Sequence, residues 1–258
     1  MSPGSAMTSI YDIYERKNYR NRIPFSGEVS FEIEVRETKL HVQAESDLTA
    51  RAKDSVFRYR YQIEEYLRQH PAFRETTSPI QIFAVAPEIV RYTDLASRLT
   101  GVAPMSCIGG AIADFVGRDL GSESTNLIVS SGGDTYIRCA FPLEVYLYAE
   151  GSPLHDKLTV VLPAVKKPLG ISTYVPGRGV HAVMVMSRSA CWASAFARDI
   201  GDRLLKGDRL AAVLDRAASY TDVGGVVLIA GSTVVFGGDM IVRSVNGDRG
   251  AGSAQESE

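Results

Sequence analysis

The pattern of apolar and polar positions predicts two strands and three helices in the first half of the chain. Residues 31–35 and 40–44 alternate apolar and polar side chains, which is typical of half-buried strands and favours a hairpin. In the next stretch apolar residues recur at every third or fourth position, with Asp47 available as a helix cap and Pro71 placed after the end. Helices are therefore expected at 47–69, 87–101 and 105–120.

From residue 126 onward, short apolar runs separated by turn residues predict a region rich in strands. Because strands and helices are grouped rather than strictly alternating, the pattern favours an α+β fold over a doubly wound sheet. The last three strands are expected to close the domain as a meander. The expected strands are 126–130, 135–140, 144–149, 158–162, 181–186, 226–229, 233–236 and 240–242, with helices at 190–205 and 208–217.

Composition narrows the class of protein. A chain of 258 residues with 45% hydrophobic residues can build one large core, so we expect a single domain over 19–245, between a flexible N-terminus (1–18) and a disordered tail (246–258). A net charge of −2 gives no general attraction for nucleic acid or an anionic membrane. No apolar run reaches the ~18 residues needed to span a bilayer. Three widely spaced cysteines fit a reduced, cytoplasmic setting and offer no metal-ligand spacing.

A Gly-Gly-Asp sequence occurs twice between apolar runs, at 132–134 and at 237–239. The repetition suggests two related β units within one domain. Gly132 and Gly133 predict a tight turn whose backbone amides are able to hold an anion. The alternative is a plain hairpin turn in which Asp134 satisfies its own backbone. That alternative is stronger for 237–239.

Two longer stretches carry a family resemblance. Residues 66–73 (Tyr-Leu-Arg-Gln-His-Pro-Ala-Phe), residues 104–114 (Pro-Met-Ser-Cys-Ile-Gly-Gly-Ala-Ile-Ala-Asp) and the turn at 132–134 together resemble an uncharacterised prokaryotic family of the ApbE-like superfamily. That superfamily is named for the FAD:protein FMN transferases. The resemblance covers roughly 19 to 243. It implies an ApbE-like (T-fold-like) α+β domain, with clustered antiparallel strands, packed helices and a pocket beside the glycine turns.

The chain departs from the transferase pattern at three positions. The transferases carry Lys-Gly-x-x-x-Asp before the Gly-Gly-Asp turn; here the matching residues are Gly109, Gly110 and Asp114, so the lysine is missing. They also carry Ala-Asp-Ala-x-x-Thr, whose Asp and Thr help to bind magnesium; here Ser194 and Arg198 stand in those places. Because an arginine repels Mg²⁺, the resemblance implies a divergent member with no metal and no magnesium-dependent FMN transfer. A flavin cofactor stays open.

Several residues are candidates for chemistry. Cys107 lies near a predicted helix start, where the helix dipole lowers the pKa of a thiol, so it is a candidate nucleophile; the alternative is a core cysteine. Asp134 and His181 are candidates for moving protons. Residues 171–181 are interpreted as a loop carrying ligand-binding groups. The candidate ligand-binding residues are Ser106, Gly109, Gly110, Gly132, Gly133, Ser172, Thr173, Arg178 and Arg198.

These patterns lead to two hypotheses. The first is a metal-independent enzyme that acts on a small anionic metabolite by transfer or hydrolysis, with the anion held by the backbones at 109–110 and 132–134. The second is a non-catalytic binding or accessory protein, with a link to sulfur assimilation, that has lost flavin-transferase chemistry. Neither hypothesis involves nucleic acid or a membrane, and a homo-oligomer is left open.

Overall fold

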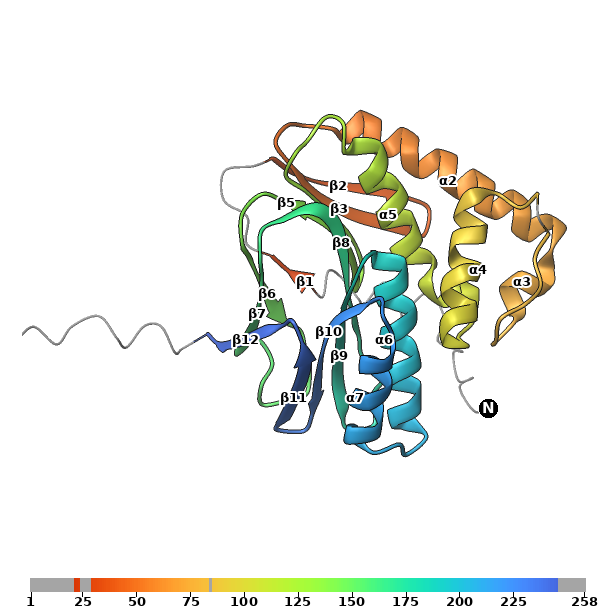
Figure 1. The fold of residues 1–258 in the computed structure, drawn as a ribbon. Coiled ribbons are helices and arrows are strands. Elements are labelled where there is room, and N and C mark those ends of the chain that lie inside the picture. Colours follow the sequence, from red (N-terminus) through yellow and green to blue (C-terminus); the bar gives the residue numbers. More distant parts are fainter. Residues whose placement is uncertain (1–20, 24–28, 84, 246–258) are drawn as a thin grey trace, which may run out of the picture.

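The structure, a computed structural model, describes residues 21–23, 29–83 and 85–245. The termini expected to be flexible (1–18) and disordered (246–258) lie outside the described residues. Strands are grouped into two antiparallel sheets, and helices cover one side (Figure 1). This arrangement confirms the predicted α+β class.

The larger sheet has eight strands, and all neighbouring strands are antiparallel. They are β2 (Val29–Val35), β3 (Thr38–Ala44), β4 (Leu127–Ser131), β5 (Asp134–Cys139), β8 (Val165–Tyr174), β9 (Val180–Ser187), β10 (Val223–Ala230) and β11 (Thr233–Gly238). Their order across the sheet is β11-β10-β9-β8-β5-β4-β3-β2, so β8 and β5 lie at its centre. The predicted hairpin is confirmed as β2 and β3.

A smaller sheet covers one face of the larger one. Its strands are β1 (Asn21–Arg22), β6 (Leu143–Leu147), β7 (Leu158–Leu162) and β12 (Ile241–Ser244). Their order is β1-β6-β7-β12. Apolar side chains from the small sheet pack with one set of alternate residues of the large sheet, including Ile128, Ile137 and Ile171.

Helices cover the opposite face of the large sheet (Figure 1). They are α2 (Thr49–Gln69), α3 (Pro71–Glu75), α4 (Glu88–Thr100), the 3-10 helix η1 (Pro104–Cys107), α5 (Ile108–Leu120), α6 (Ala190–Leu205) and α7 (Leu210–Ser219). α5 packs on β4 and β5, α6 on β8 and β9, and α7 on β10. α2 packs on β2 and α5, and α4 lies against α6, α5 and α2. The other set of alternate strand residues, including Val129 and Val185, forms the core beneath them.

The expected loop at 171–181 is wrong, because residues 165–174 form the central strand β8. The periodicity missed this strand because Ser172 and Thr173 are polar and Pro168 interrupts the run. Pro168 is tolerated because β9 pairs with β8 only from Gly170 onward, so the proline lies on a stretch that lacks this neighbour. The turn between β8 and β9 is confined to residues 175–179.

The second Gly-Gly-Asp sequence is not a second copy of the first turn. Gly132 and Gly133 connect β4 to β5 as a two-residue hairpin turn. Gly237 and Gly238 instead end β11, after which the chain crosses to the small sheet and β12 pairs with β7. The expected closing meander is therefore correct for β10 and β11 and wrong for β12.

Among the described residues, no single helix is both long and apolar enough to cross a membrane; only the helix pair Glu88–Thr100 and Pro104–Leu120, bent by 110°, meets that test jointly.

Candidate functional site

Asp134 is the first residue of β5, immediately after the Gly132–Gly133 turn. Its carboxylate faces the helix layer, where Oδ1 accepts a hydrogen bond from Ser172 Oγ at 2.7 Å. Oδ2 accepts one from Ser194 Oγ at 3.1 Å. Because Ser172 belongs to β8 and Ser194 to α6, the Asp134 carboxylate joins the central strand to the helix that packs on it. Asp134 itself remains partly exposed.

The two glycines at the start of α5 have different environments. A Cβ at Gly109 would lie 3.1 Å from Asp134 Oδ2 and 3.2 Å from Ser131 Oγ. A Cβ at Gly110 would lie only 2.5 Å from the backbone oxygen of Ala190. Gly110 therefore permits close packing between α5 and α6, as the glycine pair suggested. Gly109, the position at which the resemblance places a lysine, leaves the side of Asp134 that faces α5 without a side chain.

Arg198 lies one helical turn after Ser194 on α6. Its guanidinium carbon lies 4.6 Å from the ring centre of Tyr174, and its Nε lies 3.4 Å from Asp202 Oδ2. Tyr174 follows Ser172 by two residues on β8 and therefore shares its face of the sheet. Helix α6 and strand β8 thus contact each other at two places, first through Ser172 and Ser194, which share Asp134, and then through Tyr174 and Arg198. We define the Asp134 site as Gly109, Ser131, Asp134, Ser172, Ser194 and Arg198.

Asp114 fixes the helix that carries Ser194 and Arg198. Its carboxylate lies on α5 and accepts hydrogen bonds from the backbone nitrogens of Ala190 and Cys191, both at 2.9 Å. It thereby caps the first turn of α6 from a neighbouring helix, alongside Ser189 Oγ, which accepts from Trp192 N. Burial raises the pKa of Asp114 to about 6, against the lowering effect of these two N–H groups. Its role here is structural.

Cys107 is not part of the Asp134 site. It is fully buried at the start of α5, and its thiol donates to the carbonyl oxygen of Pro104 at 3.3 Å. Burial, and then the neighbouring Cys107 thiol, raise the pKa of Cys191 well above its ordinary value. A nucleophilic role for Cys107 stays a prediction, and the structure gives it no exposed sulfur. Ser106 approaches the site through its backbone, because its carbonyl oxygen accepts from Ser194 Oγ at 3.4 Å.

Three other candidates lie apart from the Asp134 carboxylate. Thr173 points to the face opposite Ser172, and its backbone N–H donates to Gly133 O at 2.8 Å, which supports the turn. Arg178 is exposed in the turn between β8 and β9. His181 Nδ1 lies 3.0 Å from the carbonyl oxygen of Glu150, which follows β6 of the small sheet. The ten-residue strand β8 separates groups that a single loop would have brought together.

Ser131, Ser194, Tyr174 and Asp202 belong to the site or its border but were not among the predicted ligand-binding residues. Ser194 carried a sequence signal, because it replaces a magnesium-binding residue in the resemblance. For Tyr174 the only sequence signal was its spacing of two residues from Ser172. That spacing places both side chains on one face only once the two residues are known to lie in a strand.

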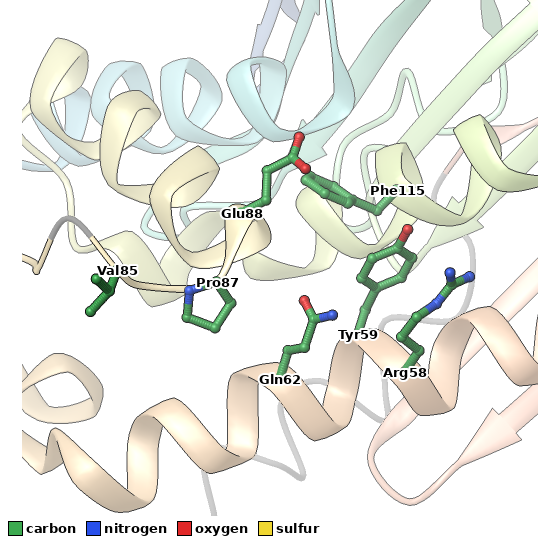
Figure 2. Close-up of a pocket in the computed structure, with 7 residues that line it drawn as sticks. All are labelled: Arg58, Tyr59, Gln62, Val85, Pro87, Glu88 and Phe115. Carbon is green, nitrogen blue, oxygen red and sulfur yellow. The ribbon is translucent and has the colours of Figure 1, made fainter.

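Two grooves elsewhere on the helix layer share no residue with the Asp134 site. One of them has a volume of about 460 Å³. In Figure 2 its lining side chains rise from α2 toward the start of α4 and toward α5. A neighbouring groove of about 420 Å³ has a largely apolar lining. The residues lining the first are Arg58, Tyr59, Gln62, Val85, Pro87, Glu88 and Phe115. We place the candidate site at Asp134 because, among the described residues, polar side chains from β4, β5, β8 and α6 converge there beside the start of α5.

The residues around Asp134 do not fit a magnesium ion. Mg²⁺ requires oxygen ligands, usually including carboxylates. Asp134 supplies one carboxylate, whose two oxygens accept from Ser172 and Ser194, and Arg198 brings a positive charge one turn away. In the described part of the chain no group of three or more His, Cys, Asp or Glu side chains could hold a metal ion.

Comparison with known proteins gives the family. The family described as AbpE bacteria matches residues 20–231, and the chain belongs to it. A UPF0280 protein from Methanospirillum hungatei is 30% identical, over 83% of this chain and 90% of the relative. Another UPF0280 protein, from Methanopyrus kandleri, is also 30% identical, over 81% of this chain and 87% of the relative.

Solved structures confirm the fold. A variant of the flavin transferase ApbE from Vibrio cholerae aligns with a TM-score of 0.53 and 12% identity, covering 86% of this chain and 98% of that one. The apo form of the Pseudomonas stutzeri flavinyl transferase ApbE aligns with a TM-score of 0.51 and 11% identity, covering 88% of this chain and 95% of that one. Together with the family match, this shared fold makes the chain a divergent ApbE-like protein.

Proposed function

We propose that this chain binds a small anionic metabolite at the Asp134 site and acts on it by transfer or hydrolysis, without a bound magnesium ion. One observation carries the proposal. The three positions at which the sequence departs from the transferase pattern, Gly109, Ser194 and Arg198, all border one site. Ser194 Oγ lies 3.1 Å from Asp134 Oδ2, a Cβ added at Gly109 would lie equally close to that oxygen, and Arg198 is one turn beyond Ser194. Three replacements that converge on one site indicate a site with changed chemistry.

The charges suggest the class of ligand. Arg198 has a side chain that is 38% exposed and supplies a positive charge suited to an oxyanion. Asp134 is a carboxylate whose orientation is set by two serine hydroxyls, so it suits the removal of a proton from a hydroxyl group or a water molecule. The expected ligand therefore carries both an anionic group, for Arg198, and a protic group, for Asp134.

The first experiment identifies what the protein retains. The purified chain is denatured, and the released small molecules are identified by mass spectrometry. An anionic metabolite present in the wild type and depleted in Asp134→Asn supports the proposal. Asp215→Asn is the matched control, because it makes the same chemical change at an exposed position of α7, away from the site. Equal amounts in the wild type and both variants would remove Asp134 from the binding site.

The second experiment separates an enzyme from a binding protein. The identified metabolite is incubated with the wild type and with Asp134→Asn, and its conversion is followed over time. Conversion by the wild type that is lost in the variant supports catalysis. Binding without conversion, in the presence of water and of candidate acceptors, favours the accessory-protein hypothesis. A sulfur-containing ligand would support its link to sulfur assimilation.

A further inference from the structure

Tyr174, Arg198 and Asp202 form a triangle at the border of the Asp134 site. The guanidinium of Arg198 stacks over the Tyr174 ring at 4.6 Å, and Tyr174 Oη donates to Asp202 Oδ1 at 3.2 Å. Arg198 Nε lies 3.4 Å from Asp202 Oδ2. These contacts engage one face and the Nε edge of the guanidinium. Among the described residues, no hydrogen bond engages the Nη atoms of Arg198.

A second triangle of the same composition serves as an internal comparison. Arg216 lies over Tyr220 at 5.1 Å, and both donate to Asp199 Oδ2, at 2.8 Å and 3.1 Å. Asp199 also accepts from Arg203, and its side chain is only 8% exposed, so this triangle fastens α7 to α6. Asp202, in contrast, has a side chain that is 39% exposed. The carboxylate of the triangle at Arg198 is therefore the more open one, whereas the two arginine side chains are similarly exposed, at 38% and 33%.

The Tyr174 ring is itself firmly placed. It projects from the central strand β8 and packs on α6 at Gly201, where a Cβ would lie 2.5 Å from the ring. Because the ring is backed by helix and strand, it restricts the guanidinium stacked upon it to one plane. A guanidinium held in this way is preorganised to bind two oxygens of one anion through its Nη atoms.

We propose that Tyr174 is a positioning residue, which holds Arg198 in the plane needed to bind an oxyanion, phosphate or carboxylate, at the Asp134 site. The inference rests on the proposed function. Two features carry it. The first is that β8 and α6 contact each other at two neighbouring pairs of residues. Ser172 and Ser194 both donate to Asp134, and Tyr174 contacts Arg198 two residues further along β8 and one turn further along α6. The second is the difference in exposure between the two triangles.

The test uses inorganic phosphate and acetate as probes, titrated into the full chain by calorimetry at constant ionic strength. Arg198→Ala is expected to weaken binding of the preferred probe by about 10- to 150-fold, as for the loss of a charge-assisted hydrogen bond. Tyr174→Leu is expected to weaken it by about 2- to 5-fold, as for the loss of a cation–π contact. Tyr174→Phe retains the ring and is expected to match the wild type. Tyr220→Leu, the matched control in the closed triangle, is expected to lower stability and leave the affinity unchanged.

Each outcome has a consequence. If neither probe binds, or Arg198→Ala binds as the wild type does, the anion site fails, and this part of the proposed function fails with it. If Arg198→Ala weakens binding but Tyr174→Leu does not, the role of Tyr174 alone is refuted. An equal loss in Tyr174→Phe or in Tyr220→Leu also refutes it, because the effect would not come from the ring beside Arg198. Should Tyr174→Leu fail to fold, Tyr174→Met, which is closer in length, replaces it under the same criteria.

Discussion

Replacing each of the two glycines at the start of α5 by alanine tests whether they serve different purposes. At Gly110 the new Cβ would lie 2.5 Å from Ala190 O and 2.8 Å from Cys191 Cα, both backbone atoms. To restore the ordinary contact distance of 3.4 Å, the first turn of α6 would have to move by about 0.9 Å. Overpacking of this kind typically costs about 1–3 kcal/mol of unfolding free energy. We therefore expect Gly110→Ala to be destabilised within that range.

At Gly109 the neighbouring atoms are the ends of two side chains, Asp134 Oδ2 at 3.1 Å and Ser131 Oγ at 3.2 Å. Both can shift by a few tenths of an ångström, and alanine is favoured over glycine in a helix by up to about 1 kcal/mol. We expect Gly109→Ala to be as stable as the wild type, or slightly more stable. It should nevertheless bind the retained metabolite less well, because its methyl group fills the space beside Asp134.

Urea unfolding followed by fluorescence measures the two free energies. The single tryptophan, Trp192, is buried in the first turn of α6, next to the position that Gly110→Ala would disturb. Mass spectrometry of the retained metabolite reports on binding. If Gly110→Ala is as stable as the wild type, the close approach of α5 to α6 is wrong. If Gly109→Ala loses more than about 1 kcal/mol, or retains as much metabolite as the wild type, Gly109 does not border an open site.

Three further predictions concern the metal, the buried carboxyl group and the flavin. In the double variant Ser194→Asp with Arg198→Thr, the introduced carboxylate and that of Asp134 would lie about 4 Å apart and repel each other by up to about 4 kcal/mol. Mg²⁺ bound between them should relieve this repulsion and raise the Tm, whereas the control Ser194→Asn with Arg198→Thr should show no such rise. Because burial raises the pKa of Asp114 from 3.8 to about 6, its contribution to stability is fully present below pH 3.8 and is lost as the pH rises through 6. Relative to Asp114→Asn, the wild type should therefore lose roughly 3 kcal/mol between pH 3.8 and pH 7 in urea unfolding, and a constant difference would contradict that shift. Incubation with FAD, Mg²⁺ and an acceptor protein should give no covalent flavin fluorescence above the control without enzyme.

The sequence predicted the elements whose periodicity reports on burial. The hairpin of β2 and β3 and the long helix α2 each bury one regular face, so apolar residues recur at the matching spacing. Strand β8 could not be found in this way. Its helix-facing positions carry Gly170, Ser172 and Tyr174, which serve packing on α6 and the candidate site rather than an apolar core. A strand that departs from the pattern is characteristic of a functional region.

The site was predicted in part. The family resemblance pointed to Gly109 and Arg198, and the glycine turn pointed to Asp134. The structure places Gly109 beside the Asp134 carboxylate and Arg198 one turn of α6 beyond Ser194. The sequence could not separate Gly109 from Gly110, because both glycines lie in the same helical turn and only the fold shows which neighbour each one meets. Nor could it reveal that His181 lies toward the small sheet, because the register between β9 and β10 shifts beside this residue and breaks the simple alternation of faces.

The hydrogen bonds that Asp114 accepts from the backbone of α6 affect what can be inferred from its motif at residues 104–114. A carboxylate that fastens the start of one helix to the flank of another is required for the helices to dock, whatever reaction the surface groups perform. Asp114 can therefore be retained for this structural reason even in a chain that lacks the lysine at position 109 and the metal-binding residues at positions 194 and 198. A motif match at this position identifies ancestry and architecture. Inheritance of the reaction has to be judged from Gly109, Ser194 and Arg198.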